Sequence, residues 1–490
     1  MNSKINGKKV KNFLMQNNVT LLFIILSTLA FIASGTTLTY LLPELVTRIG
    51  RNTFMVLSLL IPVVAGLGLN FGIVIGAISA QISIFIVVLW GGSGPLGLLM
   101  CVVISTPLAI LFGYLVGRLF NSMKGTEMVG GLVAGYFSDG LYQFLFLFVL
   151  GGIIKINHSG LMISTGVGVK NAINLGGNLK YALDNVSMIA VLDLAFWAML
   201  ALTAINVVSR IAKKQELQWK KLLQAFLPVA GLYALSFVPI VSQFLSAPRL
   251  LLLNAIEIAV VIAVIYNIYR LIRKDKVRTR ITNIVIAVAV YGMTFIPALY
   301  QALLVVRIPV LTFLCIGSLC LFIQWFLNTK LGQEMRTVGQ SRSVATSAGI
   351  NVDKTRIIAM IMSTVLASYG QLITLQNIGT VATYGAHQQV GLYAIAALLV
   401  GGASVHRATI KQAILGIVLF HSLFILAPLA GKALMGNAQI GEYFRVFVAY
   451  GVIALALAMH AWKAKSTKDS KSDEGRALTA GASPIDTTQE

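Results

Sequence analysis

Glycines and an asparagine interrupt one of the long apolar runs of this sequence. Gly66, Gly68 and Gly72 surround Asn70 where the apolar segments 53–69 and 71–90 meet. Each glycine lowers helix propensity by about 1 kcal/mol, and transporters place substrate sites at such broken helices. The pattern predicts a helix break that puts Gly68, Asn70 and Gly72 beside a substrate pathway, with the Asn70 side chain facing its cavity. Close helix packing through Gly68 and Gly72 explains the pattern equally well.

Ionisable and amide side chains inside the other apolar runs are further candidates, because such residues are costly in a membrane. Glu257 lies in the middle of the run 250–266, and similar positions are held by Asp193, Gln324, Gln371, Asn377 and His421. A proton relay needs several carboxylates at membrane depth, and we count two at most, which weakens the case for an ion-coupled secondary transporter.

Histidine and cysteine offer no metal site in this pattern. His387 and His406 are expected in loops away from carboxylates, and Cys101, Cys315 and Cys320 have no CxxC spacing. An HExxH motif, a serine-nucleophile motif and a GxxxxGK[ST] phosphate loop are also missing from the sequence. We therefore expect no cofactor, no enzymatic activity and no ATP binding through a Walker motif of this chain.

The polar stretch 329–356 carries helix signals of its own. Met335 and Val338 are spaced as the apolar face of a short helix, which Gly339 can end. Ser341 or Ser343 can cap a second short helix, which Gly349 can end. The pattern predicts a short helix lying across the membrane surface against a partner, with an ordinary basic loop as the alternative.

The elements that position these residues follow from composition. Of the 490 residues, 57% are hydrophobic and 11% charged, whereas soluble domains carry about 25% charged residues. The sequence predicts an all-α, polytopic transmembrane helical bundle of about 12–14 helices, including broken or half-spanning ones, over residues 18–464. The apolar segments are 18–42, 53–69, 71–90, 96–117, 128–154, 186–208, 222–243, 250–272, 281–304, 309–328, 355–376, 389–402, 408–430 and 443–463.

The net charge of +22 comes from short basic clusters between apolar runs, which is typical of the positive-inside rule and not of nucleic-acid binding. These clusters fall on one side if every segment crosses. We therefore predict a basic cytoplasmic N-terminus (1–17), a cytoplasmic loop (329–356), a disordered cytoplasmic tail (465–490) and an extracytoplasmic loop (155–185) with one short helix. Arg48 and Arg51 fall on the opposite side.

Four stretches together resemble one family. Arg336, Gly339, Gly349 and Ile350 match a pattern "R-x-x-G-x-N-x-x-A-A-x-x-x-G-I", with Ser341 where asparagine is common. The others are 66–72 with Gly76, 117–130 with Asn121, Lys124 and Gly125, and 393–402. They are similar to the importer permeases for branched-chain amino acids, simple sugars and nucleosides. The resemblance covers 53–154 and 309–463 best, and 222–272 looks like an insertion.

The resemblance implies a permease subunit of an ATP-binding-cassette (ABC) importer in a bacterial inner membrane, in contact with lipid. It implies separate ATPase subunits, a second permease subunit and an extracytoplasmic solute-binding protein. The implied contacts to the ATPase are Met335, Arg336, Val338, Gly339, Gln340, Gly349 and Ile350. The expected pathway residues are Gly68, Asn70, Gly72, Asn121, Glu257 and Asn377. The solute stays open among sugars, nucleosides, branched-chain amino acids and vitamins.

Overall fold

The computed structural model describes residues 18–212, 226–227, 229–231, 233–273, 277–451, 453–454 and 458. The predictions for 1–17 and 465–490 lie outside these residues. Nearly all regular structure is helical: α2 Asn18–Ser34, α3 Leu38–Ser58, α4 Leu60–Val64, α5 Ile73–Leu89, α6 Gly94–Ser122, α7 Glu127–Phe144, the π-helix η1 Leu145–Ile153, α8 Met188–Ala212, α10 Pro239–Ser246, α11 Leu252–Ile272, α12 Val277–Met293, α13 Pro297–Val305, α14 Val310–Phe326, α15 Lys330–Gln340, α16 Arg342–Ser347, α17 Val352–Ile378, α18 Ala386–Val400 and α19 Ile410–Met435.

Several of these helices are long and apolar enough to cross a bilayer. In the described part of the chain six helices qualify, or eight if two sharply bent pairs, α12–α13 and α14–α15, each count as one span. Three shorter apolar helices, at 19–34, 73–89 and 386–400, add to the bundle. The prediction of an all-α polytopic membrane protein is confirmed, and its count of 12–14 includes short and broken helices as well as full spans.

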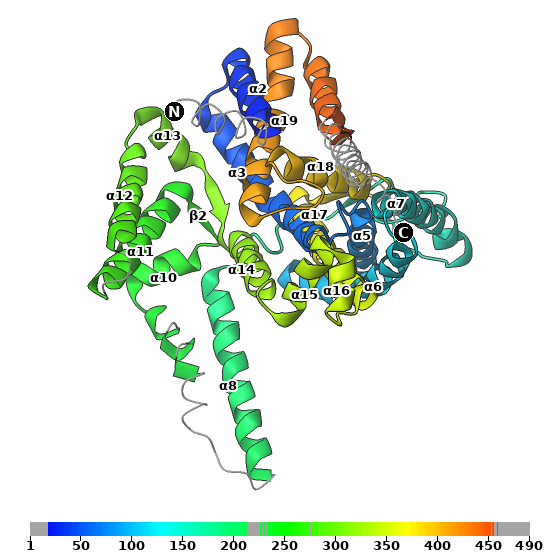
Figure 1. Ribbon diagram of the computed structural model, residues 1–490, viewed down its shortest axis with the longest axis horizontal. Helices are drawn as coiled ribbons and strands as arrows, with labels where there is room; N and C mark the ends of the chain where they lie inside the picture. Colours follow the sequence, from blue (N-terminus) through cyan, green and yellow to red (C-terminus); the bar gives the residue numbers. More distant parts are fainter. Residues whose placement is uncertain are drawn as a thin grey trace, which may run out of the picture.

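Helix α17 forms the centre of the bundle, with α3, α5 and α6 packed around it (Figure 1). Glycines allow the close approach. A Cβ added at Gly76 of α5 would lie 2.5 Å from the carbonyl oxygen of Thr364, and one at Gly113 of α6 would lie 2.7 Å from the Cα of Ile361. Because these contacts join backbone to backbone, the centre of the bundle has no space for a larger residue.

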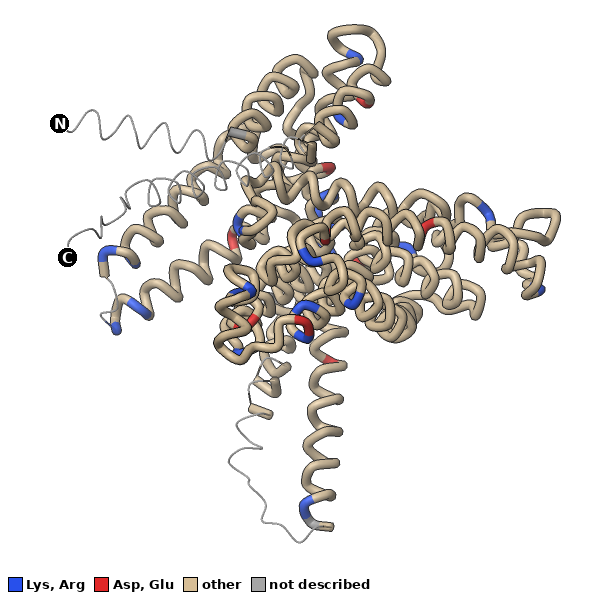
Figure 2. The backbone as a smooth tube through the Cα atoms, turned by 45° about the vertical axis from the view of Figure 1, so that its right-hand side comes forward, with Lys and Arg blue, Asp and Glu red and all other residues tan. Residues whose placement is uncertain are grey.

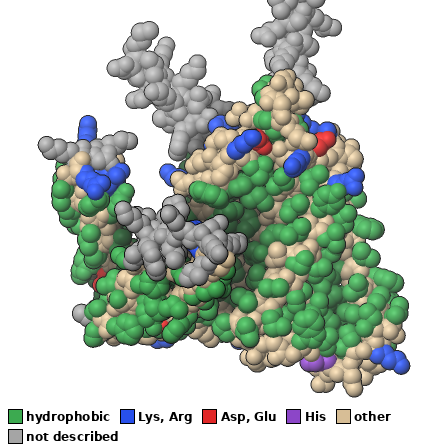
Figure 3. Space-filling model, turned by 90° about the horizontal axis from the view of Figure 1, so that it is seen from below, with side chains coloured by type: hydrophobic (Ala, Val, Ile, Leu, Met, Phe, Trp, Pro, Cys, Tyr) green, Lys and Arg blue, Asp and Glu red, His purple; other side chains and the backbone are tan. Residues whose placement is uncertain are grey.

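The segment from α8 to α13 lies at the edge of this bundle, and α8 extends away from it (Figure 1). Its large apolar side chains face outward: Leu194 is 72% and Ile272 75% exposed. In Figure 2 a basic residue lies near the far end of α8, and several lie near the tip of the α11–α12 hairpin. Figure 3 shows apolar side chains over much of one face, with basic residues near its margins. This distribution suits a surface in contact with lipid.

Two short antiparallel strand pairs connect distant loops. β1 (Ala172–Asn174) pairs with β4 (Thr380–Ala382), and β2 (Arg249–Leu251) pairs with β3 (Arg307–Pro309). The first pair joins the loop 155–185 to the C-terminal end of α17, whereas α15–α16 precede its N-terminal end. The 27 residues of α17 span about 40 Å, more than the ~30 Å of a bilayer core. That the two loops face opposite sides of a membrane stays a prediction.

Three local predictions from the sequence are wrong. The first segment is not one helix from 18 to 42, because α2 ends at Ser34 and is followed by Gly35, which has φ +60°. Helix α3 then continues through the polar residues 43–52, where Glu44 pairs with Arg48 at 2.9 Å. His387 lies in α18 and not in a loop. The described loop 155–185 contains turns and β1 but no helix, and its Leu161, Val169 and Leu175 are buried in the core.

Candidate functional site: the broken helix and its neighbours

The helix break predicted from glycine spacing is present. Helix α4 ends at Val64, α5 begins at Ile73, and residues 65–72 between them form turns and a bend without regular structure. Gly66 and Gly68 have φ of +72° and +75°, a backbone conformation that side chains with a Cβ rarely adopt. The break is therefore built into the sequence by these two glycines.

Asn70 is completely buried in this break and turns toward α17. Its Nδ2 donates to Oγ of Ser363 at 3.2 Å, and Oγ of Ser363 donates to the carbonyl oxygen of Ser58 at 3.0 Å. The asparagine thus ties the break to α17 and α3. It lies beside the candidate pathway rather than in its wall, whereas its neighbour Phe71 lines a cavity.

The glycines of the break also serve close packing. A Cβ at Gly131 of α7 would lie 3.1 Å from the amide nitrogen of Gly72, and one at Gly68 would lie 3.2 Å from Val405. Packing and a helix break, which the sequence leaves as alternatives, therefore occur together at Gly68 and Gly72.

A cavity of about 170 Å³ lies between the break, α7 and α18. The break contributes Phe71, and Val74 of α5 lies next to it. Helix α7 contributes Tyr136 and Asp139, and α18 contributes Gln388. The remaining lining residues are Leu132, Gly135, Gly391, Leu392, Ile395 and Tyr450. Apolar walls with a few convergent polar groups are typical of small-molecule sites.

Asp139 is the centre of the polar groups at this cavity. Its Oδ1 lies 2.6 Å from Nε2 of the buried His387, and its Oδ2 accepts from Nε2 of Gln388 at 2.5 Å and of Gln143 at 3.0 Å. The ring of Tyr142 packs against His387 with centroids 5.1 Å apart. Sequence reasoning missed this cluster, although Asp139 is a carboxylate inside the predicted span 128–154 and could have been singled out on that ground.

Helix α15 contacts the break directly. Met335 and Val338, predicted as its apolar face, are 0% and 2% exposed and point into the protein. Gly339 follows on the same side: a Cβ there would lie 2.1 Å from the carbonyl oxygen of Val64, and one at Gly66 would lie 2.7 Å from the Cα of Gly339. The backbones of α15 and the break therefore touch with no side chain between them.

The second short helix of this stretch is α16, and its ends match the sequence signals. Oγ of Ser341 accepts from the amide of Val344 at 3.4 Å, and Gly349, just beyond the helix, has φ +76°. Gly339 does not end α15, which continues to Gln340. Val344 is 59% exposed, and the exposed residues around it are Gln333, Arg336, Gln340, Ser343, Thr346, Ser347, Ala348 and Gly349.

An ion cluster holds α16 to the bundle. Glu127 at the start of α7 pairs with Arg342 of α16 and with Arg356 of α17, the latter at 2.5 Å. Arg356 is fully buried and also donates to the carbonyl oxygen of Phe120 at 3.3 Å. Glu127 thus links α16 to the N-terminal ends of α7 and α17.

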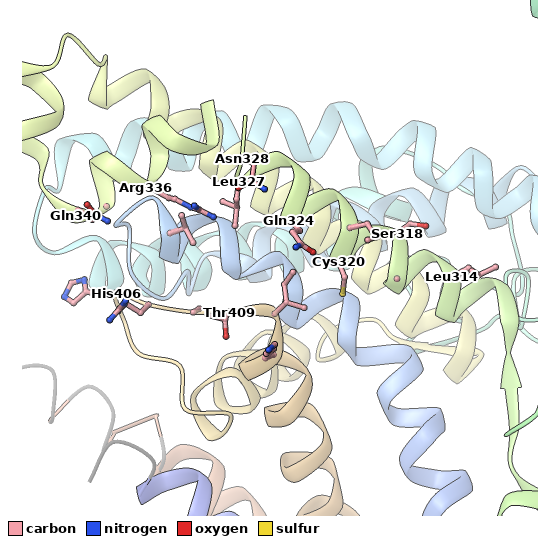
Figure 4. Close-up of a pocket in the computed structure, with 18 residues that line it drawn as sticks. Leu314, Ser318, Cys320, Gln324, Leu327, Asn328, Arg336, Gln340, His406 and Thr409 are labelled. Atoms are coloured by element: carbon pink, nitrogen blue, oxygen red, sulfur yellow. The ribbon is translucent and has the colours of Figure 1, made fainter. Parts of the chain in front are cut away.

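A second, larger cavity of about 1130 Å³ lies between α14, α15, the loop 406–409 and the start of α19 (Figure 4). Figure 4 shows Arg336 and Gln340 of α15 on one side and His406 and Thr409 of the loop on the other. Gly339, which contacts the break, also lines it. The exposed side of α15 thus borders an open space beside the α14–α15 bend.

The other predicted pathway residues do not join the break. Asn121, at the end of α6, donates to the carbonyl oxygen of Asp353 at 2.9 Å, near α16. Asn377 lies at the opposite end of α17 and donates to Oδ2 of Asp184 at 2.7 Å. Glu257 lies in α11 within the peripheral segment and makes no hydrogen bond or ion pair to any described residue.

Comparison with known proteins agrees with this architecture. A stretch of 171 residues is 29% identical to the xylose transport system permease protein XylH of Haemophilus influenzae. The matched stretch covers 35% of this chain and 42% of that relative. No solved structure matches the chain.

A family model covers a larger part of the sequence. The model described as branched-chain amino acid transport system / permease component matches residues 144–459, more than half of the chain. The match includes α15, α16 and the segment 393–402, whereas the break and the start of α7 precede it. The chain therefore belongs to the branched-chain amino acid transport system permease family.

Proposed function

We propose that this membrane protein is the permease subunit of an ABC importer, in which separate subunits hydrolyse ATP and this chain forms the pathway for a small polar solute. The ATPase contact in this proposal is the exposed surface of α15 and α16, with Arg336, Gln340 and Gly349 among its residues. A second permease subunit and an extracytoplasmic solute-binding protein complete the proposed assembly. Both termini lie in the cytoplasm of a bacterial cell.

The observation that carries this proposal is the backbone contact between Gly339 and the break at Val64–Gly66. Because packed backbones shift as units, a movement imposed on α15 moves the break directly and is not absorbed by flexible side chains. The break borders the cavity that holds Phe71 and Asp139. Docking of an ATPase at α15 is thereby linked to opening of that cavity through Gly339 and the break. In this arrangement Met335, Val338 and Gly339 transmit the movement, and the exposed residues receive it.

The solute in this proposal is a sugar or a similarly hydroxylated molecule. The carboxylate of Asp139 can accept hydrogen bonds from hydroxyls, and the amide of Gln388 can donate and accept them. The rings of Phe71 and Tyr136 offer apolar faces. The partial similarity to a xylose permease points in the same direction. Uptake of labelled pentose, hexose, nucleoside and leucine by cells that express the complete importer distinguishes these classes.

The coupling step is tested by Gly339→Ala in the assembled importer. Its methyl group forces α15 away from Val64, so we expect uptake to fall by about tenfold or more while ATPase subunits still bind. The matched control is Gly292→Ala in α12, a helical glycine with nothing within 4 Å of the added Cβ. Normal uptake by Gly339→Ala would show that the α15 contact transmits nothing.

A further inference from the structure

A small pocket collects three arginines at the end of α17 that lies away from α15 and α16. Arg51 comes from α3, Arg249 from β2 and Arg307 from β3, and the volume between them is about 100 Å³. We call it the arginine pocket. Its other lining residues are Thr47, Gly50, Tyr181, Asp184, Pro309, Thr312 and Asn377. No part of the proposed coupling path or of the Asp139 cavity reaches it.

Asp184 is the one carboxylate in this lining, and its oxygens accept hydrogen bonds from neighbouring polar side chains. It is 1% exposed, and its Oδ1 accepts from Oγ1 of Thr312 at 2.5 Å and from Nε2 of Gln376 at 2.9 Å. Its Oδ2 accepts from Nδ2 of Asn377 at 2.7 Å. No ion pair joins it to an arginine among the described residues. The lining therefore carries two positive charges in excess.

The guanidinium groups have unused donors. Arg249 donates to Oδ1 of Asn185 at 3.2 Å and lies 4.6 Å from the ring centroid of Tyr181, but its Nε is buried without a hydrogen-bond partner. The side chains of Arg51 and Arg307 make no hydrogen bond or ion pair within the described ranges of the chain. The buried unpaired Nε of Arg249 and the like-charge repulsion among the three arginines both favour an anion between these groups.

We propose that the arginine pocket binds a small oxyanion, the phosphate or carboxylate group of a ligand. The planar guanidinium fork matches such groups in two-point hydrogen bonds. The pocket volume is about 100 Å³. It has room for one small charged group. The bound anion joins α3 to the β2–β3 strand pair and so fastens the peripheral segment to the bundle.

The anion has two possible sources, dissolved phosphate or the phosphate of a lipid headgroup. The full chain, purified in an uncharged detergent, is melted over a series of inorganic phosphate concentrations at constant ionic strength. In parallel it is melted in nanodiscs of phosphatidylcholine with or without phosphatidylglycerol, without added phosphate. A phosphate effect in detergent identifies the dissolved ion, and an effect of phosphatidylglycerol alone identifies the headgroup. Either result supports the site.

Variants decide whether the effect belongs to the pocket. We expect saturable stabilisation of the wild type, and about tenfold weaker apparent affinity in Arg51→Gln and Arg307→Gln, because each loses a charge-assisted fork. Because Arg307 is exposed, its replacement leaves folding intact. Arg307→Lys keeps the positive charge but loses the planar guanidinium fork, so this variant should retain part of the affinity. Arg48→Gln is the control, one turn from Arg51 but paired with Glu44. Equal anion dependence in all variants, or none in the wild type, overturns the proposal.

Discussion

Helices α8 and α17 are both long and apolar enough to cross a membrane, yet they have opposite surroundings. In the most apolar 18 residues of α17, 61% of positions are buried, against 0% in α8. Helix α17 touches α3, α5 and α6 along its length, whereas α8 extends from the bundle with Leu194 and Trp197 exposed. Hydrophobicity alone therefore does not tell a central helix from one that faces lipid.

Polar residues show the same contrast more sharply. Ser363, Thr374 and Gln376 of α17 all have hydrogen-bond partners in other helices or loops. Asp193 of α8 has no hydrogen bond or ion pair within the described part of the chain. Removal of any of these three bonded residues leaves its hydrogen-bond partner unsatisfied. Asp193 therefore has no hydrogen-bond partner among the described residues to lose.

The largest effect is expected from breaking the central ion cluster with Glu127→Gln. This change leaves Arg356 fully buried without its carboxylate, and loss of one partner of a buried pair costs about 3–5 kcal/mol. We expect a much lower melting temperature in detergent and little folded protein in membranes.

The matched control for that variant is Glu44→Gln. Glu44 also pairs with an arginine, Arg48, but the pair is partly exposed, and such pairs contribute about 0.2–1 kcal/mol. Similar losses of stability in the two variants would mean that Arg356 is accessible to water. The ion cluster would then behave like a surface ion pair.

Local chemistry explains what the sequence predicted well. The break at 65–72 and the turn at Gly349 follow from positive-φ glycines, and the start of α16 follows from a capping serine. These signals need only a few neighbouring residues. The all-α membrane fold follows from composition in the same direct way.

Contacts between distant segments could not be predicted. Asp139 and His387 are 248 residues apart, and Asp184 and Thr312 are 128 apart. Their pairing depends on how α7, α14 and α18 pack, which no periodicity encodes. The error at 18–42 has a similar origin: α3 tolerates Glu44 and Arg48 because they pair, and Leu41 and Leu45 pack on α19.

A middle-sized effect is expected from adding one methyl group to a glycine in the centre. The Cβ of Gly416→Ala would lie 1.9 Å from the carbonyl oxygen of Ala397, so α19 must move away from α18. Overpacking of this kind costs about 1–3 kcal/mol. Melting curves of the purified protein measure the loss.

The peripheral counterpart is Gly292→Ala, where the added methyl meets open space. Alanine is the better helix former by about 1 kcal/mol, so this variant should be equal to the wild type or slightly more stable. If both alanine variants lose stability equally, the peripheral segment is packed against something as tightly as the centre is.

The smallest effect is expected at the hydrogen bond between Asn70 and Ser363. Ser363→Ala removes its bonds to Asn70 and to the carbonyl of Ser58, and hydrogen bonds inside membrane proteins contribute about 0.6–1.7 kcal/mol. We expect a small fall in melting temperature and nearly normal uptake.

Because Asn70 is buried and Phe71 lines the cavity, Phe71→Cys should react with a small membrane-impermeant thiol reagent in a background without Cys101, Cys315 and Cys320. Asn70→Cys should not react. Labelling of Asn70→Cys, or loss of uptake in Ser363→Ala at unchanged stability, would place Asn70 in the wall of the pathway, and would mean that the break opens farther during transport than its packing shows.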